Sequence, residues 1–167
     1  YFAFRARSIK DIFSVSEYPM WIDTHCHLDA AEFDADRESV IQQALKHDIK
    51  MMVVPAVHRN NFEAVTQLAQ THPCCGHALG IHPLYVTSSQ YADLSFLAEE
   101  VGRQMQSAHP PVAIGEIGLD FFIEGYDKAL QAHYFVEQLK IAKQYDLPVI
   151  LHVRRAIDDI LKHLRKH

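Results

Sequence analysis

The feature that most constrains the fold is a repeating unit in which a short apolar run is followed by an amphipathic helical pattern. The apolar runs do not alternate with polar residues, and they recur at intervals of roughly 30 residues, the usual length of a β-α unit. Runs of this kind are typical of parallel strands that helices cover. The sequence therefore predicts an α/β fold with a parallel sheet. The five runs are Met20–His27, Met51–Val57, His77–Pro83, Val112–Asp120 and Pro148–Val153.

Chain length sets a limit on this fold. The chain has 167 residues, whereas a complete (β/α)8 barrel takes about 250 residues and rarely fewer than about 200. Residues 1–19 stand outside the repeating pattern, and we expect them to be an extension of a core fold that covers residues 20–167. The expected helices are Arg37–His47, Asn60–Thr71, Asp93–Gln106, Asp127–Tyr145 and a last helix that carries Ile157, Ile160, Leu161 and Leu164.

Composition restricts the partners and the location. With a net charge of −5, the chain as a whole does not attract a nucleic-acid backbone. Any phosphate must therefore be bound by positive charge close to the site. The 3 cysteines are an odd number, which favours a reducing compartment, and we expect a cytoplasmic location. The apolar runs fall short of the roughly 18 residues of a membrane span, so no membrane partner is expected. The most unusual number is 12 histidines, because histidine often binds metals or moves protons near neutral pH.

Two histidines flank a cysteine where the first run is expected to end. Side chains two apart on a strand point to the same face, so His25 and His27 would point one way while Cys26 faces the helix layer as a small hydrophobic residue. Ligands of parallel α/β folds bind at the C-terminal ends of strands, where such a pair can chelate a divalent ion. Asp23 shares this face and is expected to orient one imidazole. The alternative is a pair of exposed polar residues without a ligand.

Titratable side chains also stand inside two later runs. Glu116 lies in an apolar strand, where a carboxylate is costly unless it is paired or metal-bound. Gly118 and Asp120 share its face, which would leave a gap beside the acid. His152 stands in the fifth run. Histidines bonded to backbone carbonyls are the alternative for any one position, but three strand ends that together deliver His, His, Glu and His favour a metal site.

Four motifs, in order and at matching strand ends, resemble those of the TatD-type metal-dependent deoxyribonucleases, which belong to the amidohydrolase-like (β/α)8 barrels of the TIM-barrel class. The resemblance covers residues 21–164 and the N-terminal two-thirds of the family pattern. It implies an incomplete barrel that holds about five of the eight β-α units. The motifs are Asp23–Leu28, Gly80–Pro83, Gly115–Asp120 and Leu147–His152, the last followed by Arg154 and Arg155.

The resemblance implies a hydrolase with two divalent metal ions. His25 and His27 would hold the first ion, Glu116 would bridge both, and His152 would hold the second. These ligands suit Mg, Mn, Zn or Fe, so the identity of the metal stays open. Two such ions activate a water molecule and stabilise both the attacking and the leaving oxygen of a phosphodiester displacement. The bridging glutamate favours the nuclease branch, because relatives that act on amides or lactones often carry a carboxylated lysine there.

The family pattern also supplies a histidine on strand six and an aspartate on strand eight, and this sequence ends at His167, before either. His163 and His167 lie four residues apart on the last helix and can chelate weakly. Because Lys162, Arg165 and Lys166 surround them, we expect a solvated basic helix end instead.

Further polar residues near the strand ends are assigned to the substrate and to catalysis. His82 is predicted to line the substrate cleft, with a purely local hydrogen bond as the alternative. Arg154 and Arg155 are predicted to meet phosphate oxygens, and an ordinary charge pair at a helix start is the alternative. Asp120, together with Glu116, is predicted to be catalytic by orienting the metal water or a ligand, whereas a loop-capping carboxylate would need no such role.

Three hypotheses of function remain at this point. The leading one is a divalent-metal-dependent hydrolase of phosphodiester bonds, a deoxyribonuclease type of enzyme that cleaves DNA ends or short oligonucleotides. The second is a small-molecule hydrolase on the same metal scaffold. The third is a truncated chain without catalytic competence. For any of them, a five-stranded sheet with two exposed edges invites self-association.

Overall fold

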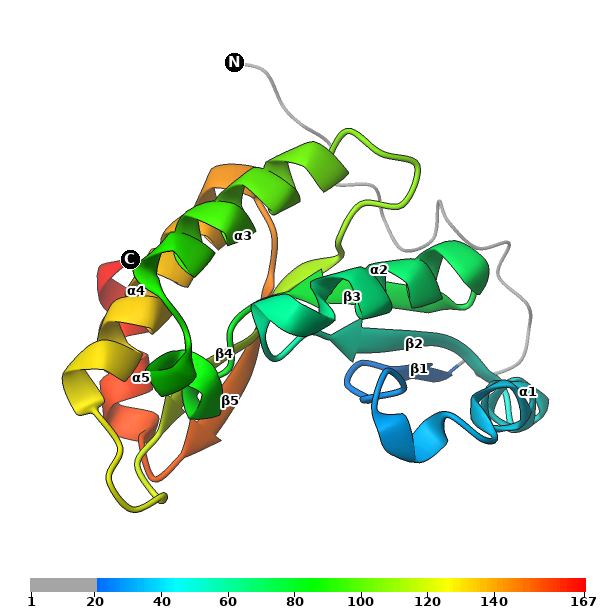
Figure 1. Cartoon of the computed structure of the whole chain (residues 1–167), viewed down its shortest axis with the longest axis horizontal. Helices are drawn as coiled ribbons and strands as arrows, with labels where there is room; N and C mark the ends of the chain where they lie inside the picture. Colours follow the sequence, from blue (N-terminus) through cyan, green and yellow to red (C-terminus); the bar gives the residue numbers. More distant parts are fainter. Residues whose placement is uncertain (1–20) are drawn as a thin grey trace.

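Five parallel strands form one sheet in the part of the chain that the computed structural model describes, residues 21–167. The strands lie in chain order, so neighbours in the sequence are neighbours in the sheet. Figure 1 shows the sheet curled into part of a barrel with the helices around it. The predicted α/β fold, an incomplete (β/α)8 barrel of five units, is confirmed. The strands are β1 (Trp21–Asp23), β2 (Ile49–Pro55), β3 (Cys75–Leu79), β4 (Ala113–Asp120) and β5 (Val149–Arg154).

A helix follows each strand, close to the predicted position. The side chain of Asp127 starts the longest helix by accepting a hydrogen bond from the backbone N–H of Leu130 at 2.9 Å, and Asp146 ends it in the left-handed conformation. The helices are α1 (Arg37–Lys46), α2 (Phe62–Thr71), α3 (Tyr91–Gln104), α4 (Lys128–Tyr145) and α5 (Ile157–Lys166), with short 3-10 helices η2 (Ala31–Phe33), η3 (Arg59–Asn61) and η4 (Pro83–Ser88).

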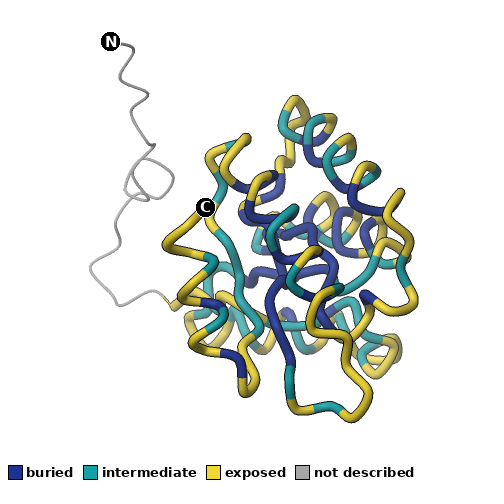
Figure 2. The backbone as a smooth tube through the Cα atoms, turned by 90° about the vertical axis from the view of Figure 1, so that its left-hand side faces the viewer, coloured by how far each residue is buried: buried dark blue, intermediate teal, exposed yellow. Residues whose placement is uncertain are grey.

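The core lies between the sheet and the helices. All residues of β3 and β4 are buried, whereas β1 and β5 are partly exposed because they form the edges of the sheet. Figure 2 shows buried segments in the interior of the molecule and exposed segments around them. Helices α1, α2 and α4 pack against β2, β3 and β4. Fully buried side chains such as Leu79, Ile114 and Phe135 each contribute about 1.5–3 kcal/mol. Strand β4 lies between β3 and β5 and is covered by α4, which suits it to position a buried acid.

The predicted extension over residues 1–19 lies outside the described residues. Within residues 21–167, none of the helices combines the length and the apolar character that crossing a bilayer requires.

Candidate metal centre

Glu116 lies within β4 and is 6% exposed. The pairing of β4 with β5 shifts its register between Ile114 and Ile117, so Glu116 belongs to a β-bulge. The backbone N–H of Glu116 donates to the carbonyl of Ala56, just after β2, at 2.9 Å. Bulges re-aim side chains beside functional sites. Here the bulge lies where the carboxylate meets histidines from three other segments.

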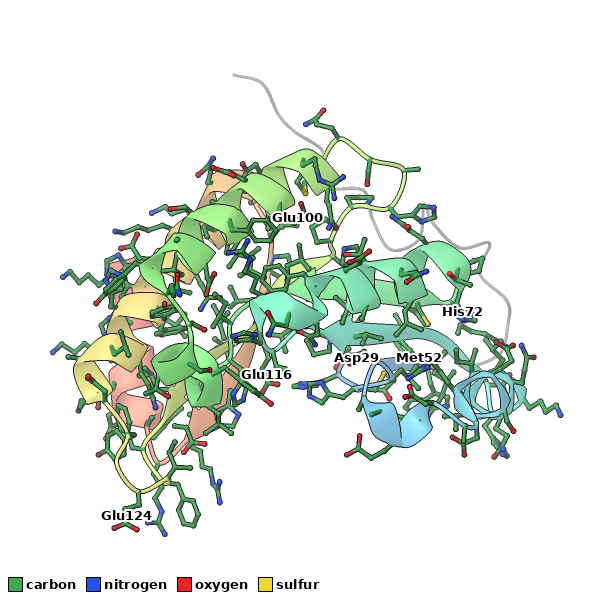
Figure 3. All side chains as sticks on the ribbon, viewed as in Figure 1. Asp29, Met52, His72, Glu100, Glu116 and Glu124 are labelled. Atoms are coloured by element: carbon green, nitrogen blue, oxygen red, sulfur yellow. The ribbon has the colours of Figure 1, made fainter. Side chains whose placement is uncertain are left out.

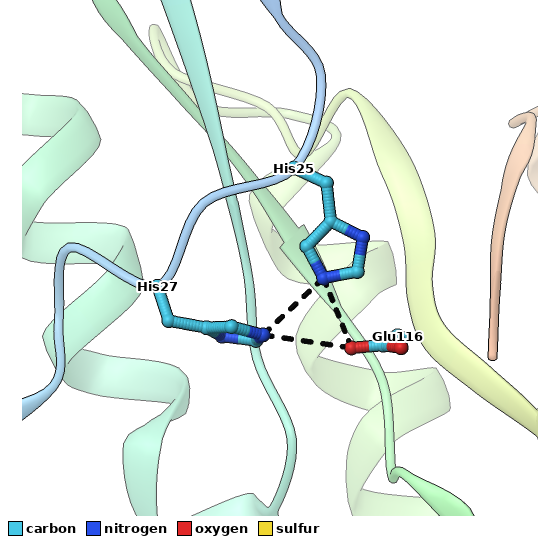
Figure 4. Close-up of side chains that lie close together, drawn as sticks. All are labelled: His25, His27 and Glu116. Atoms are coloured by element: carbon cyan, nitrogen blue, oxygen red, sulfur yellow. Dashed lines mark hydrogen bonds and ion pairs between the residues drawn. The ribbon is translucent and has the colours of Figure 1, made fainter.

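The first donor group consists of His25, His27 and Glu116. The Nε2 atom of His25 lies 3.0 Å from Oε2 of Glu116, and the Nε2 atom of His27 lies 3.6 Å from the same oxygen (Figure 4). The two Nε2 atoms are 3.2 Å apart. Two nitrogen ligands at about 2.0–2.1 Å from a tetrahedral zinc ion stand roughly 3.4 Å apart. The three donors are therefore spaced as ligands of one divalent ion would be.

The two histidines of this group do not lie on a strand, and the prediction of a strand through His27 is wrong. Strand β1 ends at Asp23, whose Oδ1 atom accepts a hydrogen bond from the backbone N–H of His25 at 3.1 Å. The backbone N–H of Cys26 then donates to the carbonyl of Val53 at 3.0 Å. These two bonds hold the segment that follows β1 beside β2. The two imidazoles therefore point to the same place although the segment is not a strand. Asp23 fixes the backbone of His25 rather than an imidazole.

Cys26 packs against the hydrophobic core, and its thiol lies 3.7 Å from the carbonyl oxygen of Val53. Burial, assisted by the charge of Asp23, raises the pKa of the Cys26 thiol to about 11. The thiol is therefore neutral near pH 7 and behaves as a small hydrophobic group rather than as a thiolate ligand.

The second donor group consists of His82, His152 and Glu116. The Nδ1 atom of His152 lies 3.2 Å from Oε1 of Glu116, and the Nε2 atom of His82 lies 3.6 Å from the same oxygen. The two rings meet edge to face with their centroids 4.2 Å apart. The structure therefore brings His82 against the same carboxylate as the three histidines that the resemblance assigns to metal.

Hydrogen bonds distinguish the roles of His82 and His152. The Nδ1 atom of His82 accepts the backbone N–H of Leu84 at 3.1 Å, so a neutral His82 carries its proton on Nε2. His82 can then donate a hydrogen bond into the site but has no free lone pair there for a metal. His152 has the opposite arrangement, because its Nε2 atom faces Oδ2 of Asp120 at 2.9 Å and leaves Nδ1 free beside Glu116.

Asp120 is buried, and both of its carboxylate oxygens are engaged. Oδ2 faces His152, and Oδ1 accepts the backbone N–H of Phe122 at 2.9 Å. A carboxylate on the far nitrogen of a ligand histidine fixes the tautomer and the ring orientation. Both oxygens of Asp120 are thus bonded within the protein, one of them to His152, and the same side chain also caps the loop after β4. The catalytic role of Asp120 stays a prediction.

Two buried glutamines of α4, which the sequence analysis does not identify, hold the ends of β3 and β4. The side-chain amide of Gln131 accepts from the backbone N–H of Asp120 at 2.8 Å and donates to its carbonyl at 3.0 Å. Gln138 makes the same two bonds to Ile81, next to His82, at 2.6 and 3.1 Å. A signal was present in the sequence: the two amides stand seven residues apart on the buried face of a helix, where a polar group needs a partner.

The charges of the centre depend on one another. Burial alone would raise the pKa of Glu116, but hydrogen bonds from His152, His27 and His82 outweigh it and hold that pKa well below its usual range. The bond to Glu116 raises the pKa of His27 and of His152, against the opposite effect of burial. Glu116 is therefore ionised near neutral pH. Protons and a metal cation compete for the nitrogens that face it.

A cleft of about 590 Å³ opens beside the first donor group. His27, His82 and Glu116 line it, together with the exposed side chains of Leu84 and Tyr85. Its volume lies within the range of small-molecule sites. The structure thus places His82 where the cleft meets both donor groups.

The predicted arginines lie on the other side of the centre, beside His152. The Nη1 atom of Arg154 is 4.0 Å from Oδ2 of Asp120, and the guanidinium groups of Arg154 and Arg155 lie over the ring of Phe122. Both arginines are exposed. The phenylalanine between them is a residue that the sequence analysis does not identify.

The gap predicted beside Glu116 at Gly118 is not found, whereas His163 and His167 lie outside both donor groups, as expected from the sequence. A Cβ atom on Gly118 would lie 2.0 Å from the carbonyl oxygen of His152, and Gly118 has φ 149°, so the close approach of β5 requires glycine rather than a gap beside Glu116. His163 and His167 stack with ring centroids 6.3 Å apart, and they join neither donor group within residues 21–167.

Comparisons with known proteins cover the same residues. Residues 22–167 match the family described as TatD related DNase. The chain is 40% identical over 147 residues to the Escherichia coli protein named "Uncharacterized metal-dependent hydrolase YjjV", with 88% of this chain and 56% of that protein covered. It is 31% identical over 147 residues to human "Deoxyribonuclease TATDN3", with 81% and 52% covered. The chain spans about half the length of the curated relatives it matches.

Two solved structures have the same fold over the described part of the chain. The crystal structure of YJJV, a TatD homolog from Escherichia coli, superposes with a TM-score of 0.83 at 40% identity, covering 88% of this chain and 56% of the other. A TatD family hydrolase from Entamoeba histolytica gives a TM-score of 0.79 at 20% identity, covering 90% and 55%. Because its identity is only 20%, the comparison with the Entamoeba histolytica protein supports the fold alone.

Proposed function

The chain belongs to the TatD-related DNase family, and from that premise we propose that it binds two divalent metal ions and hydrolyses phosphodiester bonds in DNA or short oligonucleotides. The observation that carries the proposal is the convergence of His25, His27 and His152 on the two oxygens of the buried Glu116. Relatives are named metal-dependent hydrolases and deoxyribonucleases. The activity of this chain is part of the proposal.

The donor set fits divalent ions because it combines an ionised carboxylate with imidazole nitrogens, the ligands that Mg, Mn, Zn and Fe accept. His25 and His27 would hold the first ion, Glu116 would bridge both ions, and His152 would hold the second. When bound, the ions supply Lewis acidity that makes water a better nucleophile and offset the charge of the phosphate. With a net charge of −5, the chain relies on such local positive charge to hold an anionic substrate.

The remaining residues of the site orient these donors and the substrate. Asp120 holds His152 by its far nitrogen. His82 carries a proton on the nitrogen that faces the site, so it can donate a hydrogen bond to a phosphate oxygen. Arg154 and Arg155 can bind further phosphate oxygens through their guanidinium groups. Glu116 and the histidines thus form the reacting centre, and the arginines extend it towards the rest of the substrate.

The proposal is tested by incubating the full chain with Mg²⁺, Mn²⁺, Zn²⁺ or Fe²⁺ and end-labelled single-stranded DNA, and by resolving the products on a denaturing gel. We expect cleavage with at least one metal, and its loss with EDTA or in Glu116→Gln. His109→Ala, an exposed histidine outside both donor groups, is the matched control and should cleave as the wild type does.

Two outcomes would contradict the proposal. Cleavage of bis(p-nitrophenyl) phosphate without cleavage of DNA would favour a small-molecule hydrolase. Binding of metal without cleavage of either substrate would favour a chain without catalytic competence.

A further inference from the structure

One asparagine side chain joins the loop after β1 to the loop after β2. The Oδ1 atom of Asn61, in η3, accepts the backbone N–H groups of Val57 and His58, both at 3.1 Å. Its Nδ2 atom donates to Oδ2 of Asp29 at 2.7 Å. This orientation of the amide follows from its partners, because a backbone N–H only donates and therefore faces the oxygen. Asp29 and Glu116, which Figure 3 labels, both line the cleft beside the first donor group. We call the bond between Asn61 and Asp29 the loop link.

The loop link reaches a turn that begins at His27. The backbone N–H of Ala30 donates to the carbonyl of His27 at 3.0 Å and closes this turn. Arg37, the first residue of α1, holds the same turn through the carbonyls of Leu28 and Ala30, at 2.6 and 3.1 Å. The place of the His27 imidazole therefore depends on a turn that α1 holds on one side and the loop link on the other.

The loop after β2 is bonded in turn to the segments that carry the rest of the centre. The carbonyl of Val57 accepts the backbone N–H of His82, just after β3, at 2.9 Å. The carbonyl of Ala56 accepts that of Glu116, in β4, at the same distance of 2.9 Å. The loop link thus ties the turn of the first donor group to the loop against which His82 and Glu116 are fixed.

The capping of a short helix explains only part of this arrangement. The N–H of His58 bonded to Asn61, and the N–H of Asn60 bonded to Nδ1 of His58 at 3.2 Å, cap η3. A cap needs neither the N–H of Val57 nor the carboxylate of Asp29, which lies 32 residues earlier in the chain. The Oδ1 atom of Asp29 is buried and has no hydrogen-bond partner within residues 21–167. In that part of the chain, Asn61 therefore orients this carboxylate.

We propose that Asn61 is a positioning residue of the candidate metal centre, which fixes the turn at His27 through Asp29 and thereby raises the affinity of the first donor group for a divalent ion. Residues that hold metal ligands from behind contribute roughly 10- to 100-fold to metal affinity. This inference rests on the proposed metal binding and adds to it a residue that is not itself a ligand.

The variant Asn61→Asp separates the loop link from the cap. It keeps an oxygen for the two backbone N–H groups but replaces the donor towards Asp29 by a second carboxylate oxygen. Isothermal titration calorimetry with Zn²⁺ should show the first site, identified as the one that His25→Ala removes, weakened by roughly 10- to 100-fold. The second site should stay within about two-fold of the wild type, because His152 contacts Asp120 rather than the loop after β1.

A swap of the two side chains tests the link itself. In the double variant Asn61→Asp with Asp29→Asn, the amide at position 29 can donate to the carboxylate at position 61, so the affinity of the first site should return to within about three-fold of the wild type. The matched control is Asn60→Asp, which places the same charge one residue away on an exposed side chain and should leave both sites as they are.

Hydrogen exchange of the metal-free protein provides a second readout. In EDTA, the amides of residues 26–30 should exchange at least about ten-fold faster in Asn61→Asp than in the wild type, because local opening breaks one contact fewer. The amides of β4 and β5 should exchange as before. Asp29→Ala, which removes the acceptor from a half-buried side chain and leaves the cap of η3 intact, should have the same effects on exchange and on the first site.

The proposal is overturned if Asn61→Asp and Asp29→Ala leave the first site and the exchange of residues 26–30 unchanged, if they weaken both sites equally, or if the swap does not restore the first site. Faster exchange throughout the chain in both variants would likewise overturn it, because Asn61 would then serve the fold as a whole. A wild-type chain that binds no Zn²⁺ would refute the proposed function, whereas the exchange of residues 26–30 would still decide whether Asn61 positions the turn.

Discussion

Replacing Gln131 by methionine removes the two hydrogen bonds that join α4 to the end of β4 while it keeps a side chain of similar length. Gln131 is 1% exposed, and its amide bonds both the N–H and the carbonyl of Asp120, at 2.8 and 3.0 Å. The substitution leaves two buried backbone groups without this partner, and each unsatisfied group costs about 1–3 kcal/mol. We expect the free energy of unfolding to fall by about 2–4 kcal/mol, because a carbonyl tolerates the loss better than an N–H does.

Urea unfolding followed by circular dichroism measures this difference. The matched control is Gln144→Met, the same change at an exposed position of α4, which should stay within about 0.5 kcal/mol of the wild type. At roughly 2–4 °C per kcal/mol for a domain of this size, the melting temperature of Gln131→Met should fall by roughly 5–15 °C. Equal stability of the two variants would refute the reasoning that the amides of α4 hold the ends of the strands.

Three further predictions concern the centre and the sheet edges. Gly118→Ala places a Cβ atom 2.0 Å from the carbonyl oxygen of His152, so β5 must move, and we expect urea unfolding to show a loss above about 2 kcal/mol; unchanged stability would contradict the close approach. Because the bond to Glu116 raises the pKa of His27 and His152, their contribution to the stability of metal-free protein is complete below about pH 6.5 and is lost as the pH rises through the raised values. Urea midpoints in EDTA should therefore fall as the pH rises above about 6.5, and a rise in the midpoint would count against this pairing. Metal affinity measured by calorimetry should increase as the pH rises. Finally, the open sheet edges and exposed apolar residues of α5 should produce concentration-dependent oligomers in light scattering, which Leu161→Glu reduces; a monomer at every concentration would contradict this expectation.

The fold could be predicted from the sequence, and so could the placement of the main candidate metal ligands in one site. Apolar runs at regular intervals define parallel strands, and the C-terminal ends of parallel strands lie at one edge of a sheet. For this reason Glu116 and His152, which are far apart in the sequence, could be assigned to one site before their distance was known. The incomplete barrel followed from the count of β-α units and from the family motifs.

The features that could not be predicted from the sequence are those that depend on contacts between particular side chains and backbone groups. Strand β1 ends at Asp23, whose side chain accepts a hydrogen bond from the backbone N–H of His25. The pattern of apolar residues does not reveal such a bond. The proton on Nε2 of His82 follows from its contact with the backbone of Leu84. The role of Gln131 requires knowing which backbone groups it reaches, and the exposure of Phe122 beside two arginines requires knowing where the loop after β4 lies.

The most direct test of the central claim, that Glu116 bridges two metal sites, is the stoichiometry of Zn²⁺ or Mn²⁺ binding measured by isothermal titration calorimetry on the wild type, His25→Ala and Glu116→Gln. We expect two bound ions in the wild type and loss of only the first site in His25→Ala. Glu116→Gln should lose both, because each donor group uses one oxygen of this carboxylate. Binding by Glu116→Gln with the stoichiometry and affinity of the wild type would contradict the account.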